Sequence, residues 1–116
     1  MSKFMEIEIK LVPIYGSAGL EGRYPNLANF LKEWGYERII ADRPSLYHLV
    51  DVLTRVRNDP AIPGHAKTPI NRLHDKIQKV HDEAREHLLS RHLNELDQTL
   101  YRLEDLYDDL EKELRW

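Results

Sequence analysis

The sequence predicts an α+β protein dominated by helix, in which a small β-α-β-α head precedes a helical arm. Two patterns lead to this prediction. Apolar and charged residues alternate over residues 5–11, which is the period of a half-buried strand. From Ile70 onward the chain has no glycine or proline for 47 residues, and its apolar residues recur at helical spacing. We therefore expect a head over residues 1–58, a Pro/Gly linker over 59–67 and an arm over 68–116.

Within the head, two strands and two helices are expected to alternate. After the first strand, Pro25 suits the first turn of a helix, and Gly35 supplies its C-terminal end. The short apolar run at residues 38–41 is predicted to be the second strand. A stripe of Leu and Val residues then indicates a helix over residues 46–58. Since two strands make a poor sheet, a third is expected from the next segment or from a partner.

The arm carries two apolar seams whose members are alternately three and four residues apart. The first seam contains Ile70, Leu73, Ile77, Val80 and Ala84, and the second contains Leu93, Leu96, Leu100, Leu103, Tyr107, Leu110 and Leu114. The two seams differ in phase. Two arrangements are consistent with this: a hairpin that turns at residues 88–92, or one long coiled-coil-like helix. The missing Gly and Pro favour the long helix. The hairpin is preferred because a lone helix leaves its seam in water unless it dimerises.

Charge is distributed unevenly along the arm. Residues 94–116 contain three Lys or Arg against eight Asp or Glu, a net charge of −5, whereas residues 67–93 have a net charge of +2. Folding back would bring these halves together, which also favours the hairpin. The acidic half is the predicted contact surface for a protein partner or a second copy. Its contact residues are the second seam: Leu93, Leu96, Leu100, Leu103, Tyr107, Leu110 and Leu114.

Several functional classes are excluded or disfavoured by composition. The chain has no cysteine, so disulfides, thiol chemistry and Cys-based metal sites are excluded. The spacing of its six histidines does not predict a metal site, and no cofactor is expected. The N-terminus lacks the pattern of a cleavable presequence, and no apolar run is long enough for a bilayer. We therefore expect the cytoplasm, or an organelle matrix reached without a cleavable presequence, and no membrane contact.

Two Arg/His spacings resemble those of helical, metal-independent RNases of the HEPN type, in which four to six residues separate an arginine from a following histidine. Arg43 precedes His48 with four residues between them, and Arg85 precedes His92 with six. Histidine would act as a general base while arginine stabilises the phosphorane. With ten arginines and six histidines, about one or two such spacings arise by chance. The RNase is therefore an alternative, and the chain is expected not to be an enzyme.

Short motifs in the head resemble a ribosomal family. An aliphatic first strand, a Gly-Arg loop, a helix ending in glycine and a Pro-led second helix follow one another in order: Ile7–Val12, Gly22-Arg23, Trp34-Gly35-Tyr36-Glu37-Arg38, Asp42-Arg43-Pro44 and Leu53–Arg57. Over residues 5–58 this order resembles the large-ribosomal-subunit protein family numbered thirty, especially its mitochondrial forms. The resemblance implies a β-α-β-α-β unit and RNA contacts through Arg23, Arg38 and Arg43.

The leading functional hypothesis is a non-enzymatic structural or interaction subunit of a larger assembly, with a ribosome as one candidate. Its C-terminal helices would bind a protein partner or a second copy, and its head would be able to contact RNA. A helical adaptor or a chaperone-like binding protein is a further alternative.

Overall fold

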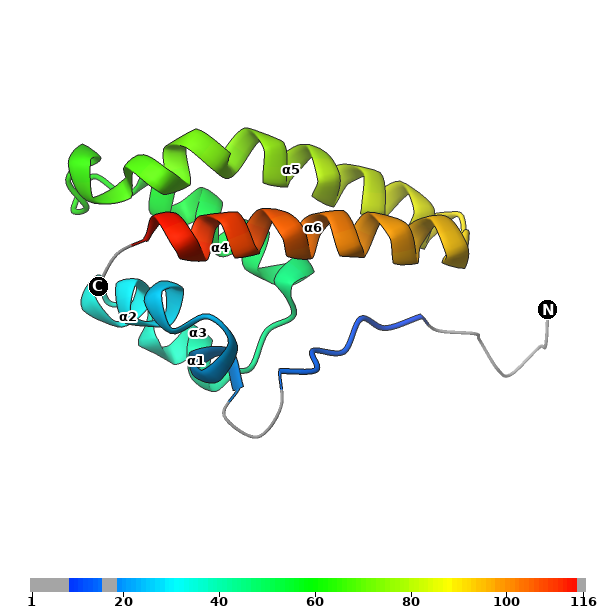
Figure 1. Ribbon diagram of the computed structural model, residues 1–116, viewed down its shortest axis with the longest axis horizontal. Coiled ribbons are helices and arrows are strands. Elements are labelled where there is room, and N and C mark those ends of the chain that lie inside the picture. The colour runs from blue at the N-terminus through cyan, green and yellow to red at the C-terminus, as the bar shows by residue number, and fades with distance from the viewer. Residues whose placement is uncertain (1–8, 16–18, 115–116) are drawn as a thin grey trace.

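The computed structural model describes residues 9–15 and 19–114, and every regular element in this part of the chain is a helix (Figure 1). Two long antiparallel helices lie side by side, a third crosses behind them, and three short helices pack below. In chain order the elements are α1 (Gly19–Arg23), α2 (Pro25–Glu33), α3 (Glu37–Ala41), α4 (Leu46–Asn58), the short 3₁₀ helix η1 (Gly64–Lys67), α5 (Thr68–Leu89) and α6 (Leu93–Glu113).

The predicted α+β head is wrong, because the described residues contain no strand. Of the first expected strand, residues 9–11 have no regular secondary structure, and residues 5–8 lie outside the described residues. The second expected strand, residues 38–41, lies within α3. Its Ile39-Ile40 pair favours a strand by composition, but no neighbouring strand is present among the described residues. A helical turn instead satisfies the backbone locally and buries Ile40.

The predicted helix ends around Pro25 and Gly35 are confirmed. Gly35 has a φ of 87°, and the next amide, that of Tyr36, donates to the Leu31 carbonyl at 2.7 Å. This is the Schellman arrangement, in which a left-handed residue closes the last turn. The Tyr36 hydroxyl then donates to Asp59 at 2.9 Å, which ties the start of α3 to the end of α4. The helix expected over residues 46–58 is also confirmed.

Of the two arrangements that fit the arm, the structure has the hairpin. Its turn is a second Schellman motif: the Arg91 amide donates to the Leu88 carbonyl at 3.2 Å, and the His92 amide donates to the His87 carbonyl at 2.9 Å. Arg91 occupies the left-handed position with a φ of 58°. Glycine is the usual residue there, so the turn carried no compositional signal.

A single hydrophobic core joins residues from the expected head to residues of the arm. Tyr107 of α6 lies at its centre with no exposed surface, 6.2 Å from the Tyr24 ring, and its hydroxyl donates to the Leu46 carbonyl at 2.9 Å. Glu111, one turn later, accepts hydrogen bonds from the Asn26 and Leu27 amides at 2.8 and 2.9 Å. A carboxylate of α6 therefore caps the N-terminus of α2.

None of the helices in the described part of the chain combines the length and apolar character that crossing a bilayer requires.

The C-terminal end of α4 is closed by a buried lysine. The Lys67 amine donates to the carbonyls of Arg57 and Asp59 at 2.9 and 3.0 Å, and to that of Val56 at 3.5 Å. The last carbonyls of a helix have no partner within the helix. Lys67 supplies one from the segment that leads into α5, and the positive charge also suits the negative end of the helix dipole.

Replacing this lysine should destabilise the protein. Lys67→Met keeps most of the aliphatic stem but leaves buried carbonyls unsatisfied, so we expect the free energy of unfolding to fall by about 1–3 kcal/mol. Urea denaturation measures the change. Lys76→Met, at an exposed position of α5, is the matched control and should change stability by less than about 0.5 kcal/mol. Equal effects of the two substitutions would contradict the capping role.

Candidate functional site

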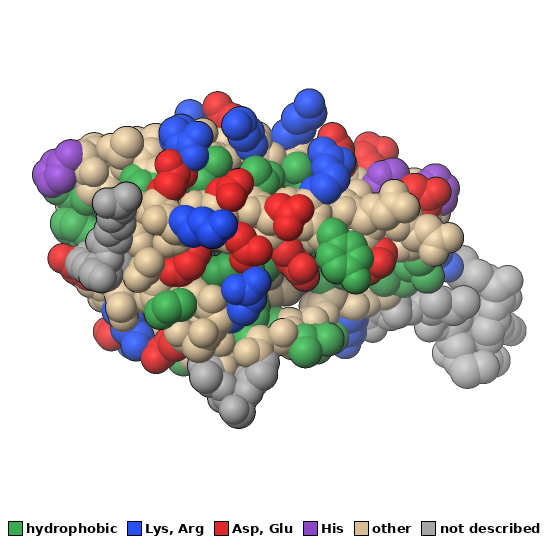
Figure 2. All heavy atoms as spheres, in the orientation of Figure 1, with side chains coloured by type: hydrophobic (Ala, Val, Ile, Leu, Met, Phe, Trp, Pro, Cys, Tyr) green, Lys and Arg blue, Asp and Glu red, His purple; other side chains and the backbone are tan. Residues whose placement is uncertain are grey.

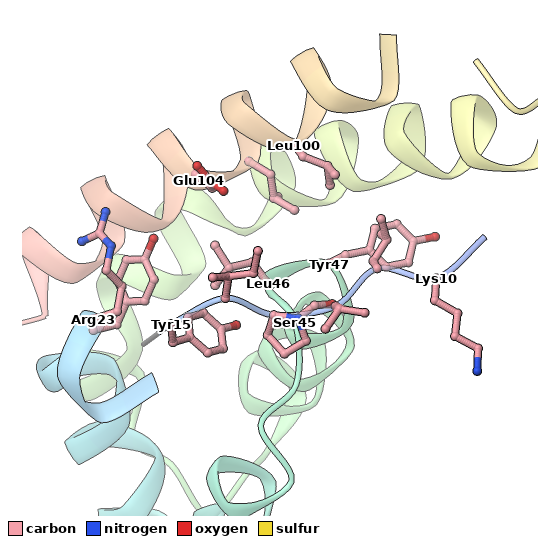
Figure 3. A pocket seen from close by; sticks show the side chains of 14 residues that line it. Lys10, Tyr15, Arg23, Ser45, Leu46, Tyr47, Leu100 and Glu104 are labelled. Atoms are coloured by element: carbon pink, nitrogen blue, oxygen red, sulfur yellow. The ribbon is translucent and has the colours of Figure 1, made fainter. Parts of the chain in front are cut away.

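A cavity of about 390 Å³ opens between the N-terminal segment and helices α1, α4 and α6 (Figure 3). We call it the α6 groove. Leu100 and Glu104 enter it from α6, while Ser45, Leu46 and Tyr47 come from the start of α4. The complete lining is Lys10, Leu11, Val12, Pro13, Ile14, Tyr15, Arg23, Tyr24, Ser45, Leu46, Tyr47, Leu100, Leu103 and Glu104.

Tyr15 fastens the N-terminal segment to the body of the protein. Its hydroxyl donates to the Pro44 carbonyl at 2.6 Å, next to the start of α4. Burial, together with the negative charge of Glu104, raises the pKa of Tyr15 to about 12. The phenol therefore stays protonated at neutral pH and remains a donor.

The N-terminal segment keeps the two-residue alternation without a sheet. Leu11, Pro13 and Tyr15 are half-buried, whereas Val12 and Ile14 between them are 72% and 94% exposed. The whole segment lines the groove, and Val12 and Ile14 are the two aliphatic side chains of its lining that stay largely exposed to solvent. Large aliphatic side chains exposed beside a cavity are typical of an interaction surface.

The polar edge of the groove is formed by α6 and α1. Arg23 pairs with Asp108 at 3.0 Å and lies 4.8 Å from the centre of the Tyr24 ring. Glu104, one turn before Asp108, has no hydrogen bond or ion pair among the described residues. Partial burial and then the neighbouring Asp108 raise the pKa of Glu104 above its usual value, although Arg23 opposes the shift. The folded protein therefore binds a proton at Glu104 more tightly than the unfolded chain does.

The predicted partner-binding seam is largely buried within the protein, and partner binding through it stays a prediction. Five of its members face the protein's own core, and Leu100 is partly buried against it. Of the seven side chains only Leu93, at the hairpin tip, is mostly exposed, at 57%. The hairpin accounts for this, because it gives the seam an internal surface to pack against. The five core members are Leu96, Leu103, Tyr107, Leu110 and Leu114.

The two Arg/His spacings do not form paired sites. Neither Arg43 and His48 nor Arg85 and His92 are joined by a hydrogen bond or ring contact in the described structure. His48 instead places its Nδ1 2.6 Å from the Ser45 hydroxyl, which also accepts the His48 amide and so caps α4. The His92 ring lies 6.0 Å from that of His87 at the hairpin tip.

An aromatic contact between α4 and α5 collects some of these residues in a different combination. The Tyr47 ring stacks on His81 with 4.3 Å between centroids and meets His48 edge-on at 5.3 Å. Arg85 lies near enough to lower the pKa of Tyr47, but burial outweighs it and raises that pKa. Asp82 accepts from Gln78 and lies 3.1 Å from His81. The contact packs two helices together, and its acidic neighbours do not suit a phosphate.

The predicted RNA contacts are exposed and come from three different parts of the chain. Arg23 is paired with Asp108, Arg38 lies on α3, and Arg43 has a φ of 48° in the turn before α4. RNA binding through these residues stays a prediction. Across the described residues, no group of three or more His, Asp or Glu side chains is placed to hold a metal ion.

Sequence reasoning missed the groove because its walls are far apart in the chain. Tyr15 and Glu104 are brought together by tertiary packing, which leaves no local pattern. The alternation of the N-terminal segment was the available signal, but it was assigned to a strand. No family model, curated protein or solved structure matches this chain, so the candidate site is defined by its geometry alone.

Replacing Glu104 with glutamine should stabilise the protein at neutral pH. A folded-state pKa above the unfolded value near 4.5 means that the folded chain binds this proton more tightly. The stability contribution is therefore present at low pH and is lost as pH rises through the folded pKa. Glu104→Gln should raise the urea midpoint at about pH 7, and this difference should disappear by about pH 3.5.

Glu86→Gln, an identical change at an exposed position of α5, is the control and should show no such pH dependence. A destabilising effect of Glu104→Gln at neutral pH would show that the carboxylate has a favourable partner within the fold.

Proposed function

We propose that this chain is a non-enzymatic interaction subunit of a larger assembly and that it binds a protein partner through the α6 groove. The observation that carries the proposal is the groove itself: a recess of about 390 Å³ with aliphatic and aromatic walls, bordered by exposed Val12 and Ile14. Peptide-binding surfaces combine such recesses for side chains with an open edge.

The internal packing of α6 refines how the subunit would bind. Since the second seam supports the protein's own core, a partner does not need to complete the fold. Binding then depends on a surface that is already formed. Most of the conformational entropy lost on binding is therefore lost by the partner or its bound segment. This suits a small subunit that docks onto an assembly after folding.

The alternatives have less support. A helical RNase needs its histidine and arginine in one cleft, but the four residues of the two spacings do not meet in that way. An adaptor or chaperone-like protein would also use an apolar groove, and it differs from the main proposal in the range of partners it accepts. Whether the assembly is a ribosome stays a prediction.

A peptide selection tests the proposal. The full chain is immobilised, and peptides from a random displayed library are enriched on it and then measured individually by fluorescence anisotropy. We expect binders whose affinity falls by about tenfold or more in Val12→Asp, because the substitution places a charge in an apolar contact. Amide chemical-shift changes on binding should map to the groove.

Leu89→Asp is the matched control, since Leu89 is 71% exposed and Val12 is 72% exposed. It makes the same chemical change at the hairpin tip and should leave binding intact. If the affinity of the binders falls in Leu89→Asp and not in Val12→Asp, the interaction surface lies at the hairpin tip and the proposal is wrong.

A further inference from the structure

The charge around the α6 groove indicates what kind of segment it takes. Acidic side chains gather along the face of the molecule where α6 runs, while basic ones lie mainly along α5 above it (Figure 2). Partial burial raises the pKa of Glu104, and Asp108, Asp105 and Asp97 of the same helix raise it further, while Arg23 lowers it. Tyr101, one turn before Glu104, is 62% exposed on the same helix.

The protein's own cations offset the charge of Glu104 only in part. Arg23 lowers the pKa of Glu104, but its ion pair is with Asp108, 3.0 Å away. The Lys10 side chain points away from the other labelled side chains of the groove. Glu104, at the edge of an apolar recess, therefore has no ion pair of its own among the described residues, and the charge of Arg23 offsets only part of the rise in its pKa. A cation supplied by a ligand would remove an electrostatic penalty that the folded protein carries.

The size of the recess limits what can enter. At about 390 Å³ it lies near the lower end of the range of about 300–1,000 Å³ typical of ligand pockets, which is room for side chains but not for a helix. Leu46, Leu100 and Leu103 provide an aliphatic surface, and Tyr47 provides an aromatic one. The recess thus suits one or two apolar side chains next to the carboxylate.

We infer that the partner presents a short segment in which lysine or arginine neighbours an aliphatic or aromatic residue, with the cation at Glu104 and the apolar side chain in the α6 groove. This inference rests on the proposed function and specifies its partner. RNA is disfavoured because its phosphates would meet the acidic face of α6. A second copy of this chain is a competing occupant that the experiment distinguishes.

The experiment uses a matched set of labelled peptides of about eight residues. All contain the same leucine and tryptophan residues, and the remaining positions are lysine, glutamine or glutamate. Fluorescence anisotropy gives their affinities for the full chain. We expect the lysine peptide to bind about fivefold more tightly than the glutamine peptide at low salt, with a smaller ratio at high salt.

Variants at Glu104 test where the preference arises. In Glu104→Gln the ratio between the lysine and glutamine peptides should fall to about one, and in Glu104→Lys the glutamate peptide should bind best. Glu86→Gln and Glu86→Lys are the controls on α5 and should keep the wild-type ratios. Because Glu104→Gln is expected to raise stability, weaker binding by that variant cannot be attributed to unfolding; circular dichroism checks the fold of each variant.

The outcomes separate this inference from the proposed function. If the glutamine peptide binds the groove as tightly as the lysine peptide, the inference of a basic partner segment is wrong, while the proposed function as an interaction subunit is still supported. If Val12→Asp changes the affinity of none of the peptides and of no selected binder, both the inference and the proposed function are wrong. If light scattering finds a dimer that Val12→Asp dissociates, the occupant is a second copy, and the inferred partner segment is wrong.

Discussion

The burial of α6 on two sides is the constraint on which the rest of the structure depends. It packs against α5 and also contacts α2 and α4, and its Asp108 pairs with Arg23 of α1. Tyr107 contributes to this burial in two ways: its ring is fully buried in the core, and its hydroxyl donates a hydrogen bond to the carbonyl of Leu46, the first residue of α4. Without α6, α2 would lose its capping carboxylate and α1 the ion-pair partner of Arg23, and helices of that length are marginal alone in water. The groove lies where this helix, the start of α4 and the N-terminal segment meet.

The acidic residues of α6 divide between internal and external roles. Glu111 caps α2, Asp108 pairs with Arg23, and Glu113 pairs with Arg72 on α5. Arg102 of α6 pairs in turn with Glu83 of α5, so charge on both helices favours the antiparallel arrangement. Each exposed pair contributes no more than about 1 kcal/mol, so together they orient the hairpin more than they stabilise it. Glu104 takes part in none of these contacts, and that difference from its neighbours makes it the candidate for recognising a partner.

Elements whose boundaries depend on nearby residues could be predicted from the sequence, whereas elements that depend on tertiary contacts could not. Pro25, Gly35 and the apolar stripes determine helix boundaries through the backbone near them, and the structure follows them. The run around Ile39-Ile40 was assigned to a strand because β-branched residues favour one, but their actual state depends on whether a neighbouring strand exists. The partner surface was assigned to the second seam for a similar reason: its apolar pattern is real, but only the tertiary fold decides which partner covers it. The groove joins residues about 90 positions apart and leaves no periodic trace.

Arg91 marks the point at which two assemblies of this chain differ. With helical dihedral angles at Arg91 and at His92, which has a ψ of 81°, α5 and α6 would form one rod of about 70 Å, and the α6 of another molecule would have to cover the seam of each α5. Such a domain-swapped dimer would remove the cost of about 1–2 kcal/mol of a left-handed arginine. The closed monomer is favoured because two chains lose translational and rotational entropy when they associate. This entropic advantage of the monomer becomes smaller as the protein concentration rises. The conformation of the two residues at the hairpin turn is thus one of the factors that determine how strongly the chain resists exchanging its last helix.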